Sequence, residues 1–237
     1  MELKGTSALV TGAGRGIGRA LALQLARAGA RVALVSRTRS ELEALAAQIA
    51  ADGGTALPVP GDLCDPAFPA AAVAAACAAH GRLEVLVNNA GVGGSAPLAE
   101  TSDEHWERVV ATNLSAPFRL TRAALPHLTR GGGHVVMISS LAGRNAIAGM
   151  SAYCASKAAL DQLAACLMLE VRHHGVKVTT VAPGSVDTTF GDGAAADGSW
   201  MLTADDVAAT VMDLLRMREG AHSSRVEMRP LRPQPRR

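Results

Sequence analysis

One tyrosine and one lysine of the sequence form a pair that can move a proton. Tyr153 is the only tyrosine among 237 residues, and Lys157 follows it four positions later in the segment Tyr-Cys-Ala-Ser-Lys. In a helix this spacing places both side chains on one face. A phenol beside an ammonium group and near a helix N-terminus is expected to have a lowered pKa, which makes Tyr153 usable as a general acid or base. The alternative is a chance pair on an amphipathic helix.

A glycine-rich segment near the N-terminus has the composition of a phosphate-binding turn. Residues 11–18 read Thr-Gly-Ala-Gly-Arg-Gly-Ile-Gly, between an expected strand and an expected helix. Glycines let the backbone approach a pyrophosphate, whose charge the exposed N–H groups of a helix N-terminus stabilise. The spacing is TGxxxGxG and not the strict GxGxxG. A purely structural turn is the alternative, but the place after the first strand of an α/β pattern favours cofactor binding.

The end of the next expected strand bears on the choice between NAD and NADP. An NAD site has an Asp or Glu there that accepts hydrogen bonds from the ribose hydroxyls. This sequence has Ser36 and Arg37 instead, and Arg15 lies in the glycine turn. Two guanidinium groups and a hydroxyl suit the 2′-phosphate of NADP. We therefore predict NADP(H) in preference to NAD(H), with simply solvated arginines as the alternative.

Further polar positions accompany the Tyr–Lys pair. Ser140 directly follows an expected strand and lies 13 residues before Tyr153. Residues 88–91 read Asn-Asn-Ala-Gly, and Asn113 lies in the helix that follows them. With the glycine turn and the YxxxK spacing, these motifs occur in one order along the chain. In this combination the sequence resembles the classical short-chain dehydrogenase/reductase family over essentially its whole length, from the glycine turn to the Pro-Gly pair at 183–184.

The resemblance implies a catalytic group of four residues. Tyr153 would protonate a carbonyl oxygen during reduction or deprotonate an alcohol during oxidation. Lys157 would lower the pKa of Tyr153 and hydrogen-bond the nicotinamide ribose. Ser140, in preference to the neighbouring Ser139, would orient the substrate oxygen, and Asn113 would hold a water in a proton relay. The hydride chemistry itself belongs largely to the cofactor.

The resemblance also implies the residues that bind the cofactor. Asp62 and Leu63 would flank the adenine, and the residues after the fourth strand would line the adenosine side. Residues that follow a late strand would position the nicotinamide. The expected set is Gly12, Arg15, Gly16, Ile17, Gly18, Ser36, Arg37, Asp62, Leu63, Asn89, Ala90, Gly91, Tyr153, Lys157, Pro183, Gly184, Val186 and Thr188.

The elements that must position these residues alternate along the chain. Short β-branched or apolar runs predict strands over 7–11, 31–36, 56–60, 83–88, 134–139, 176–182 and 225–228. Ala- and Leu-rich segments predict helices over 16–28, 40–51, 67–80, 102–129, 151–173 and 204–217. Such alternation requires right-handed crossovers between parallel strands. The expected fold is α/β, a doubly wound Rossmann fold with a seven-stranded parallel sheet flanked by helices on both faces.

We expect residues 1–237 to form one dinucleotide-binding and catalytic domain. Within it, 190–202 are predicted to be a substrate loop and 229–237 a basic, proline-rich tail. The C-terminal segment departs from the common family pattern and is similar to that of broad 3-hydroxy acid dehydrogenases. Arg144 is expected to face solvent in preference to binding a substrate carboxylate, and Trp200 either caps the pocket or anchors the loop.

Composition excludes several classes of protein. Hydrophobic residues make up 49% of the chain, and the net charge is only +2 with 3% aromatic residues, so a nucleic-acid partner is not expected. The sequence has no charge-free apolar stretch of about 18 residues, so no membrane contact is expected. The four cysteines are isolated and lack metal-ligand spacing, so we expect no metal site and the reduced thiols of a cytoplasmic protein.

The leading prediction is an NADP(H)-dependent carbonyl reductase or alcohol dehydrogenase that acts on a small-molecule carbonyl or alcohol. One rival is an NAD-dependent alcohol dehydrogenase of the same family, and another is a non-catalytic, cofactor-sensing binding protein. The family resemblance implies packing of the helices 102–129 and 151–173 against a second copy, as a homodimer or homotetramer. The substrate stays open among ketoacyl thioesters, polyketide intermediates, hydroxy acids, sugars and steroid-like ketones.

Overall fold

The computed structural model of the chain describes residues 1–188 and 199–232. The expected substrate loop 190–202 therefore lies outside the described residues up to position 198, and the expected tail 229–237 lies outside them from position 233. No helix in these two described ranges has the length and apolar character needed to cross a membrane.

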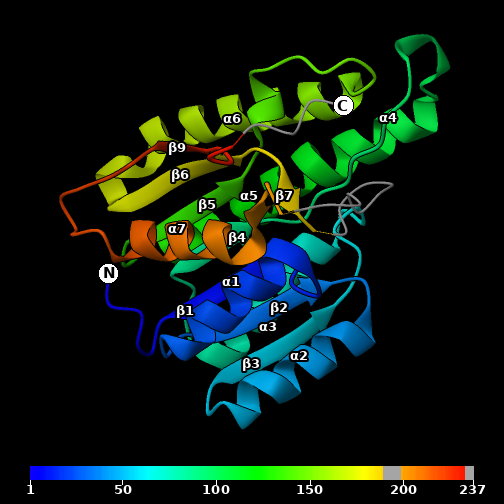
Figure 1. Cartoon of the computed structure of the whole chain (residues 1–237). Helices are drawn as coiled ribbons and strands as arrows, with labels where there is room; N and C mark the ends of the chain where they lie inside the picture. The colour runs from blue at the N-terminus through cyan, green and yellow to red at the C-terminus, as the bar shows by residue number, and fades with distance from the viewer. Residues whose placement is uncertain (189–198, 233–237) are drawn as a thin grey trace.

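Seven parallel strands form one sheet in the order β3-β2-β1-β4-β5-β6-β9 (Figure 1). The order reverses between β1 and β4, which creates a switch point where adjacent crossovers leave in opposite directions. The predicted fold is confirmed. The strands are β1 Ser7–Thr11, β2 Arg31–Ser36, β3 Thr55–Pro60, β4 Val85–Asn88, β5 Gly133–Ile138, β6 Val176–Pro183 and β9 Arg225–Met228.

Helices cover both faces of the sheet. One apolar core includes Leu21, Leu45 and Val211, so α1, α2 and α7 share a face, and the other core includes Val73 and Leu120, which lie on α3 and α5. Central strands such as β1 and β5 are buried throughout, so they are mainly apolar and show no alternation of polar and apolar residues. The helices are α1 Gly16–Arg27, α2 Arg39–Ala51, α3 Phe68–His80, α4 Asp103–Val110, α5 Ala116–Leu128, α6 Ser151–Val171 and α7 Ala204–Arg216.

The expected helix 102–129 is present over residues 103–128, but it is not α-helical throughout. The structure has α4, then a π-helical turn η2 over Ala111–Ser115, and then α5. Asn113 lies within this turn, and its side-chain amide bonds both backbone groups of Val92. These tertiary hydrogen bonds fix the widened turn, which hydrophobic periodicity does not reveal.

A short second sheet follows β6 and was also absent from the sequence prediction. β7 Val186–Asp187 pairs in parallel with β8 Leu202–Thr203. At the end of β8, Thr203 and Asp206 form a reciprocal capping box that starts α7. Single-turn 3-10 helices complete the described elements, as η1 Leu98–Glu100, η3 Leu141–Gly143 and η4 Arg172–His174.

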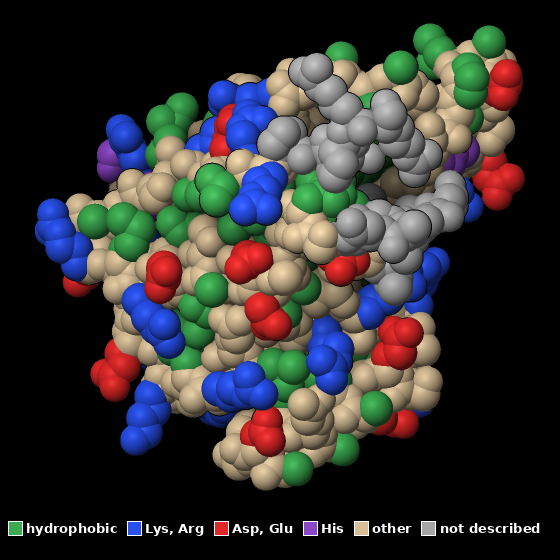
Figure 2. All heavy atoms as spheres, viewed as in Figure 1, with side chains coloured by type: hydrophobic (Ala, Val, Ile, Leu, Met, Phe, Trp, Pro, Cys, Tyr) green, Lys and Arg blue, Asp and Glu red, His purple; other side chains and the backbone are tan. Residues whose placement is uncertain are grey.

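On the face drawn in Figure 2, basic and acidic side chains are interspersed over the surface. This mixture agrees with the near-neutral net charge of +2.

Candidate active site

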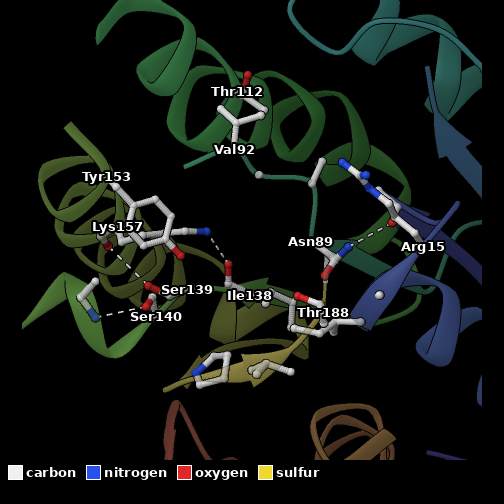
Figure 3. A pocket seen from close by; sticks show the side chains of 18 of the residues that line it. Arg15, Asn89, Val92, Thr112, Ile138, Ser139, Ser140, Tyr153, Lys157 and Thr188 are labelled. Atoms are coloured by element: carbon white, nitrogen blue, oxygen red, sulfur yellow. Dashed lines mark hydrogen bonds between the residues drawn. The ribbon is translucent and has the colours of Figure 1, made fainter. Parts of the chain in front are cut away.

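A cavity of about 1350 Å³ opens at the carboxyl ends of the sheet strands, next to the β1/β4 switch point (Figure 3). Open α/β sheets bind their ligands at this place. Its lining includes Ser140, Tyr153 and Lys157, and all of the predicted cofactor-binding residues except Gly18. The cavity therefore brings together motifs that lie far apart in the sequence.

The glycine turn forms one wall of the cavity and permits no side chains at its tightest points. Gly12 has a φ of 64°, and a Cβ there would lie 2.9 Å from Nδ2 of Asn89. A Cβ on Gly18 would collide with the carbonyl oxygen of Gly12. Gly18 is thus buried against the turn instead of lining the cavity, and its absent side chain lets α1 pack closely.

Thr11 and Asn89 join the glycine turn to the end of β4. The Thr11 hydroxyl oxygen accepts hydrogen bonds from the backbone N–H groups of Asn89 at 2.9 Å and Ala90 at 3.0 Å. In return, Nδ2 of Asn89 donates to the carbonyl oxygen of Thr11 at 2.8 Å. Sequence reasoning gave Thr11 no role, although it is the first residue of the TGxxxGxG segment that forms the turn. These hydrogen bonds connect the glycine turn to the end of β4, and the two segments together form the floor of the cavity.

The adenosine end of the cavity carries mixed charge. Ser36, Arg37 and Arg15 all line it, as predicted, but so does Glu41 from the first turn of α2. The Glu41 carboxylate lies so close to Gly14 that a Cβ on Gly14 would collide with it. The hydroxyl of Ser36 is buried and has no hydrogen-bond partner among residues 1–188 and 199–232. A bound ligand is the natural partner for such a group.

At the opposite end, Ser140 and Tyr153 meet. The Ser140 hydroxyl accepts a hydrogen bond from the backbone N–H of Ala142 at 3.1 Å and also hydrogen-bonds the Tyr153 side chain. The Ser139 hydroxyl donates instead to the Lys157 carbonyl oxygen at 3.4 Å. Of the two adjacent serines, Ser140 is therefore the one whose hydroxyl contacts the phenol.

The predicted lowering of the Tyr153 pKa does not occur in this structure. Burial raises the pKa of Tyr153 because it penalises the phenolate, and the Ser140 hydrogen bond offsets this only in part. The Lys157 Nζ atom lies 5.7 Å from the centre of the phenol ring and donates to the Ile138 carbonyl oxygen at 2.8 Å. Desolvation thus outweighs the helix terminus and the ammonium group on which the prediction relied.

Lys157 is itself buried, with 4% of its surface exposed. Burial lowers the pKa of Lys157 to about 8, and the Asp161 carboxylate acts in the opposite direction. A lysine with a pKa so near neutral can change its charge under physiological conditions.

Asn113 lies behind Lys157 and does not line the cavity. Its Oδ1 accepts from Val92 N–H at 2.8 Å, while Nδ2 donates to Val92 O at 2.9 Å and to the Ser156 hydroxyl at 3.1 Å. Gly91 lies between the two residues, since a Cβ there would be 3.4 Å from Asn113 Oδ1 and 3.7 Å from Lys157 Nζ. These contacts do not test the predicted water relay. Asn113 Oδ1 has a second lone pair, which can accept a hydrogen bond from a water.

Several other predicted features have a place in the structure. Arg144 is half-exposed and forms an ion pair with Glu227 at 3.6 Å, outside the residues that line the cavity. Trp200 lines the cavity and is partly buried. Thr188 packs on the glycine turn, since a Cβ on Gly16 would lie 3.4 Å from its methyl group.

The chain after β9 also reaches the cavity, which the sequence did not reveal. Residues 229–232 line it, and Gly184 makes room for this segment because a Cβ there would lie 3.4 Å from Pro230 Cδ. No local motif predicted this contact, since it depends on β9 lying beside β6. Among the described residues, no cluster of His, Cys, Asp or Glu is arranged to hold a metal ion.

A glycine turn at the switch point of a doubly wound sheet defines a class of dinucleotide-binding proteins, and the nearby Ser–Tyr–Lys group indicates oxidoreductases within that class. The chain belongs to the short-chain dehydrogenase/reductase family, because the family model described as short chain dehydrogenase matches residues 6–197. This confirms the predicted family and the enzyme class of an oxidoreductase acting on CH–OH groups.

Curated relatives support the assignment over most of the chain. The D-threitol dehydrogenase of Mycolicibacterium smegmatis is 40% identical over 191 residues, which are 80% of this chain and 74% of the relative. "Probable oxidoreductase EphD" of Mycobacterium tuberculosis is 40% identical over 183 residues, 76% of this chain but 31% of the relative. The chain thus spans about a third of the length of EphD.

Solved structures agree with the fold along almost the whole chain. A metagenomic short-chain oxidoreductase in complex with NADP is 40% identical, with a TM-score of 0.87 over 97% of this chain and 99% of that one. A short chain dehydrogenase from Burkholderia cenocepacia in complex with NADP is 35% identical, with a TM-score of 0.90 over 97% of this chain and 98% of that one.

Proposed function

We propose that the chain is an NADP(H)-dependent oxidoreductase that transfers hydride between nicotinamide and a carbonyl or secondary alcohol. The proposed substrates are of the 3-oxoacyl, keto or hydroxy-acid type, and the C-terminal departure from the common family pattern favours the hydroxy-acid type among them. The observation that carries the proposal is the Ser140–Tyr153 hydrogen bond inside the large cavity, with Lys157 buried directly behind it. In this proposal residues 1–237 act as one cofactor-binding and catalytic unit.

The residues of the cavity fit a dinucleotide. The cradle at Gly12 admits no Cβ, which leaves the backbone open to a pyrophosphate at the N-terminus of α1. The unpartnered Ser36 hydroxyl and the exposed Arg15 and Arg37 side chains suit the adenosine ribose and its 2′-phosphate. Two similar structures contain NADP. When bound, the nicotinamide supplies or accepts the hydride.

The raised pKa of Tyr153 supports a different role for this residue in each direction of the reaction. At neutral pH the phenol is protonated, so in reduction Tyr153 donates its proton to the oxygen that becomes the alcohol. Ser140 holds that oxygen by a hydrogen bond next to the phenol. In oxidation the phenol must first lose its proton, and a protonated Lys157 stabilises the phenolate that forms. Asn113 is proposed to hold the water that returns the proton behind Lys157.

A second candidate is NAD(H) dependence of the same reaction. It is favoured by Glu41, whose carboxylate lies against Gly14 at the adenosine end of the cavity. A carboxylate there repels a 2′-phosphate and can accept hydrogen bonds from ribose hydroxyls. Arg15 and Arg37 oppose this effect, so we keep NADP(H) as the preferred cofactor.

We also propose that the protein works as a cytoplasmic homodimer or homotetramer. Support comes from the outer faces of α5 and α6, where Phe118 is 45% and Leu169 is 56% exposed. Ala155, Ala158 and Ala165 on α6 are exposed as well, which allows close approach of a second helix. Light scattering after size-exclusion chromatography measures the mass of the assembly, and a monomer of 24.2 kDa contradicts the proposal.

The test is NADPH oxidation with a panel of ketones, ketoacyl thioesters and aldehydes, with Tyr153→Phe as the matched blank. Turnover in the wild type that is lost in Tyr153→Phe supports the reductase and identifies its substrate class. The same panel with NADH measures the cofactor preference. If both proteins bind NADPH yet turn over no compound, the cofactor-sensing binding protein replaces the enzyme as the better interpretation.

A further inference from the structure

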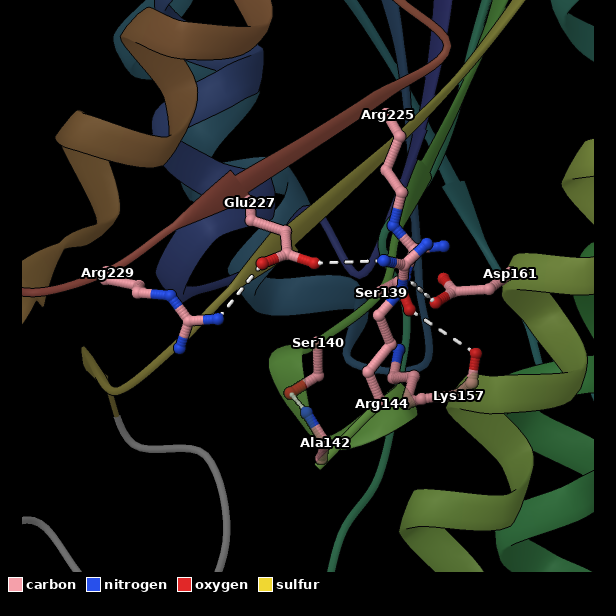
Figure 4. A network of polar contacts seen from close by, with 9 residues as sticks. All are labelled: Ser139, Ser140, Ala142, Arg144, Lys157, Asp161, Arg225, Glu227 and Arg229. Carbon is pink, nitrogen blue, oxygen red and sulfur yellow. Dashed lines mark hydrogen bonds and ion pairs between the residues drawn. The ribbon is translucent and has the colours of Figure 1, made fainter. Parts of the chain in front are cut away.

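A largely buried ion pair lies behind the catalytic end of the cavity (Figure 4). Asp161 is one helical turn after Lys157 on α6 and is 9% exposed. Its Oδ2 accepts a hydrogen bond from Nη2 of Arg225 at 2.5 Å. Arg225 is the first residue of β9, the strand at the edge of the sheet. The pair thus fastens the catalytic helix to a strand that is 64 positions away in the sequence.

The same carboxylate contacts the segment that carries Ser140. A Cβ on Gly143 in η3 would lie 3.0 Å from Asp161 Oδ2 and 3.1 Å from the carbonyl of Lys157. Ser139, at the start of this segment, is bonded to the same Lys157 carbonyl. The segment with Ser140, the turn of α6 with Lys157, and β9 are therefore packed as one unit around Asp161.

A second ion pair joins β9 to the residue after η3, but it is exposed. Glu227 lies two positions after Arg225, so both side chains are on the same face of β9. It pairs with Arg144 at 3.6 Å and with Arg229 at 3.0 Å. Exposed pairs contribute little because water and salt screen them. The buried Asp161–Arg225 pair is the stronger electrostatic feature.

Arg225 neutralises Asp161 only in part. Asp161 Oδ1 is buried and has no hydrogen-bond partner within the described part of the chain, and the same holds for Arg225 Nε. A buried carboxylate oxygen without a donor keeps a strong negative potential, because the surroundings screen it poorly. Lys157 is the buried cation one turn earlier on α6. Asp161 raises the pKa of Lys157, which limits the lowering that burial causes.

We propose that Asp161, held in place by Arg225, is a positioning residue that keeps Lys157 charged and oriented beside Tyr153. The catalytic meaning of this inference rests on the proposed function, but the charge of Lys157 can be measured without turnover. The charged or titratable side chains on the elements around Lys157 include Tyr153, Cys154 and Asp161 on α6, Arg225 and Glu227 on β9, Arg144 after η3, and Glu104, Glu107 and Arg108 on α4.

The sequence makes a direct measurement feasible. The protein has only three lysines, Lys4, Lys157 and Lys177. Labelling the lysine ε carbon with ¹³C gives three NMR signals, and the Lys4→Arg and Lys177→Arg variants assign them. We expect the Lys157 signal of the wild type to titrate at about pH 8.

Two variants that each remove one charge test the proposal, because they must shift the pKa of Lys157 in opposite directions. In Asp161→Asn, the Lys157 midpoint moves to lower pH, because the negative charge is lost in a side chain of equal size. In Arg225→Gln, the midpoint moves to higher pH, because Asp161 loses its neutralising partner. Shifts of the same sign, or no shift, overturn the proposal, since loosened packing affects both variants alike.

Controls separate folding, function and the inference. Circular dichroism checks that each variant is folded. If Asp161→Asn does not fold, Asp161→Asn with Arg225→Met removes both charges, and a smaller shift of the midpoint to lower pH is expected. If the wild type turns over no compound, the proposed function fails while the NMR result still decides this inference. If it is active, the pH dependence of kcat must shift in the same direction as the Lys157 midpoint.

Discussion

The adenosine end and the catalytic end of the cavity are built by different means. At the adenosine end the backbone of the glycine turn shapes the cavity, since Gly12 and Gly18 have no room for a Cβ. At the proposed catalytic end, which holds Ser140 and Tyr153, the contacts come from side chains, and Lys157 and Asp161 are buried. We therefore expect added side-chain volume to disturb the adenosine end most, and changes of charge or of a titratable hydroxyl to disturb the catalytic end most.

The largest expected effect lies at the catalytic end. Tyr153→Phe removes the proton donor but keeps the ring, so kcat falls by about 10²–10⁴-fold. The Kd for NADPH stays within about twofold, because the glycine turn is untouched. Steady-state kinetics and fluorescence titration measure the two quantities. If Tyr153→Phe weakens NADPH binding by the same factor as it lowers kcat, the two ends of the cavity do not have separate roles in binding and in proton transfer.

The next effect lies at the adenosine end. Gly12→Ala adds a Cβ 2.9 Å from Asn89 Nδ2 at a φ of 64°, so the NADPH Kd is expected to rise by about tenfold or more. Gly53→Ala is the matched control, because Gly53 has a φ of 79° but open space around its Cβ position. It shares the backbone strain without the crowding. Equal Kd values for the two variants contradict a backbone-built binding site.

Cofactor preference is expected to respond less strongly. Arg37→Gln lowers the ratio of NADPH to NADH affinity by about tenfold, because a charged hydrogen bond to the 2′-phosphate is lost. Glu41→Gln raises the same ratio, because it removes the carboxylate beside the glycine turn. Calorimetric titrations with both cofactors measure the ratio. If Arg37→Gln binds NADPH as the wild type does, the argument for NADP(H) is wrong.

The smallest expected effect is that of pH on the reductive reaction. The raised pKa of Tyr153 keeps the phenol protonated, so the reductive kcat is nearly constant between about pH 6 and 7. Above about pH 8 it declines as Lys157 loses its proton. The oxidative kcat instead rises with pH, because it requires the phenolate. A reductive kcat that already declines as the pH rises from about 6 to 7 contradicts a raised Tyr153 pKa.

The features that could be predicted from the sequence are those that short motifs and regular patterns encode. The glycine turn and the Tyr153–Lys157 spacing are local, and the alternation of strands and helices brings their elements to one edge of the sheet. The direction of the Tyr153 pKa was wrong because burial depends on tertiary packing. The π-helical turn at Asn113 depends on bonds to Val92, and the Asp161–Arg225 pair joins distant segments. Neither leaves a periodic signal in the sequence.

The presence of a single tyrosine in the chain has a practical consequence for spectroscopy. Because Tyr153 lines the cavity, every tyrosinate absorbance change, every tyrosine ring resonance and all energy transfer from tyrosine to tryptophan originate at the proposed active site. A ligand that enters the cavity therefore alters the complete tyrosine signal and not a small fraction of it. The proton donor of the proposed reaction is also an intrinsic optical probe of binding.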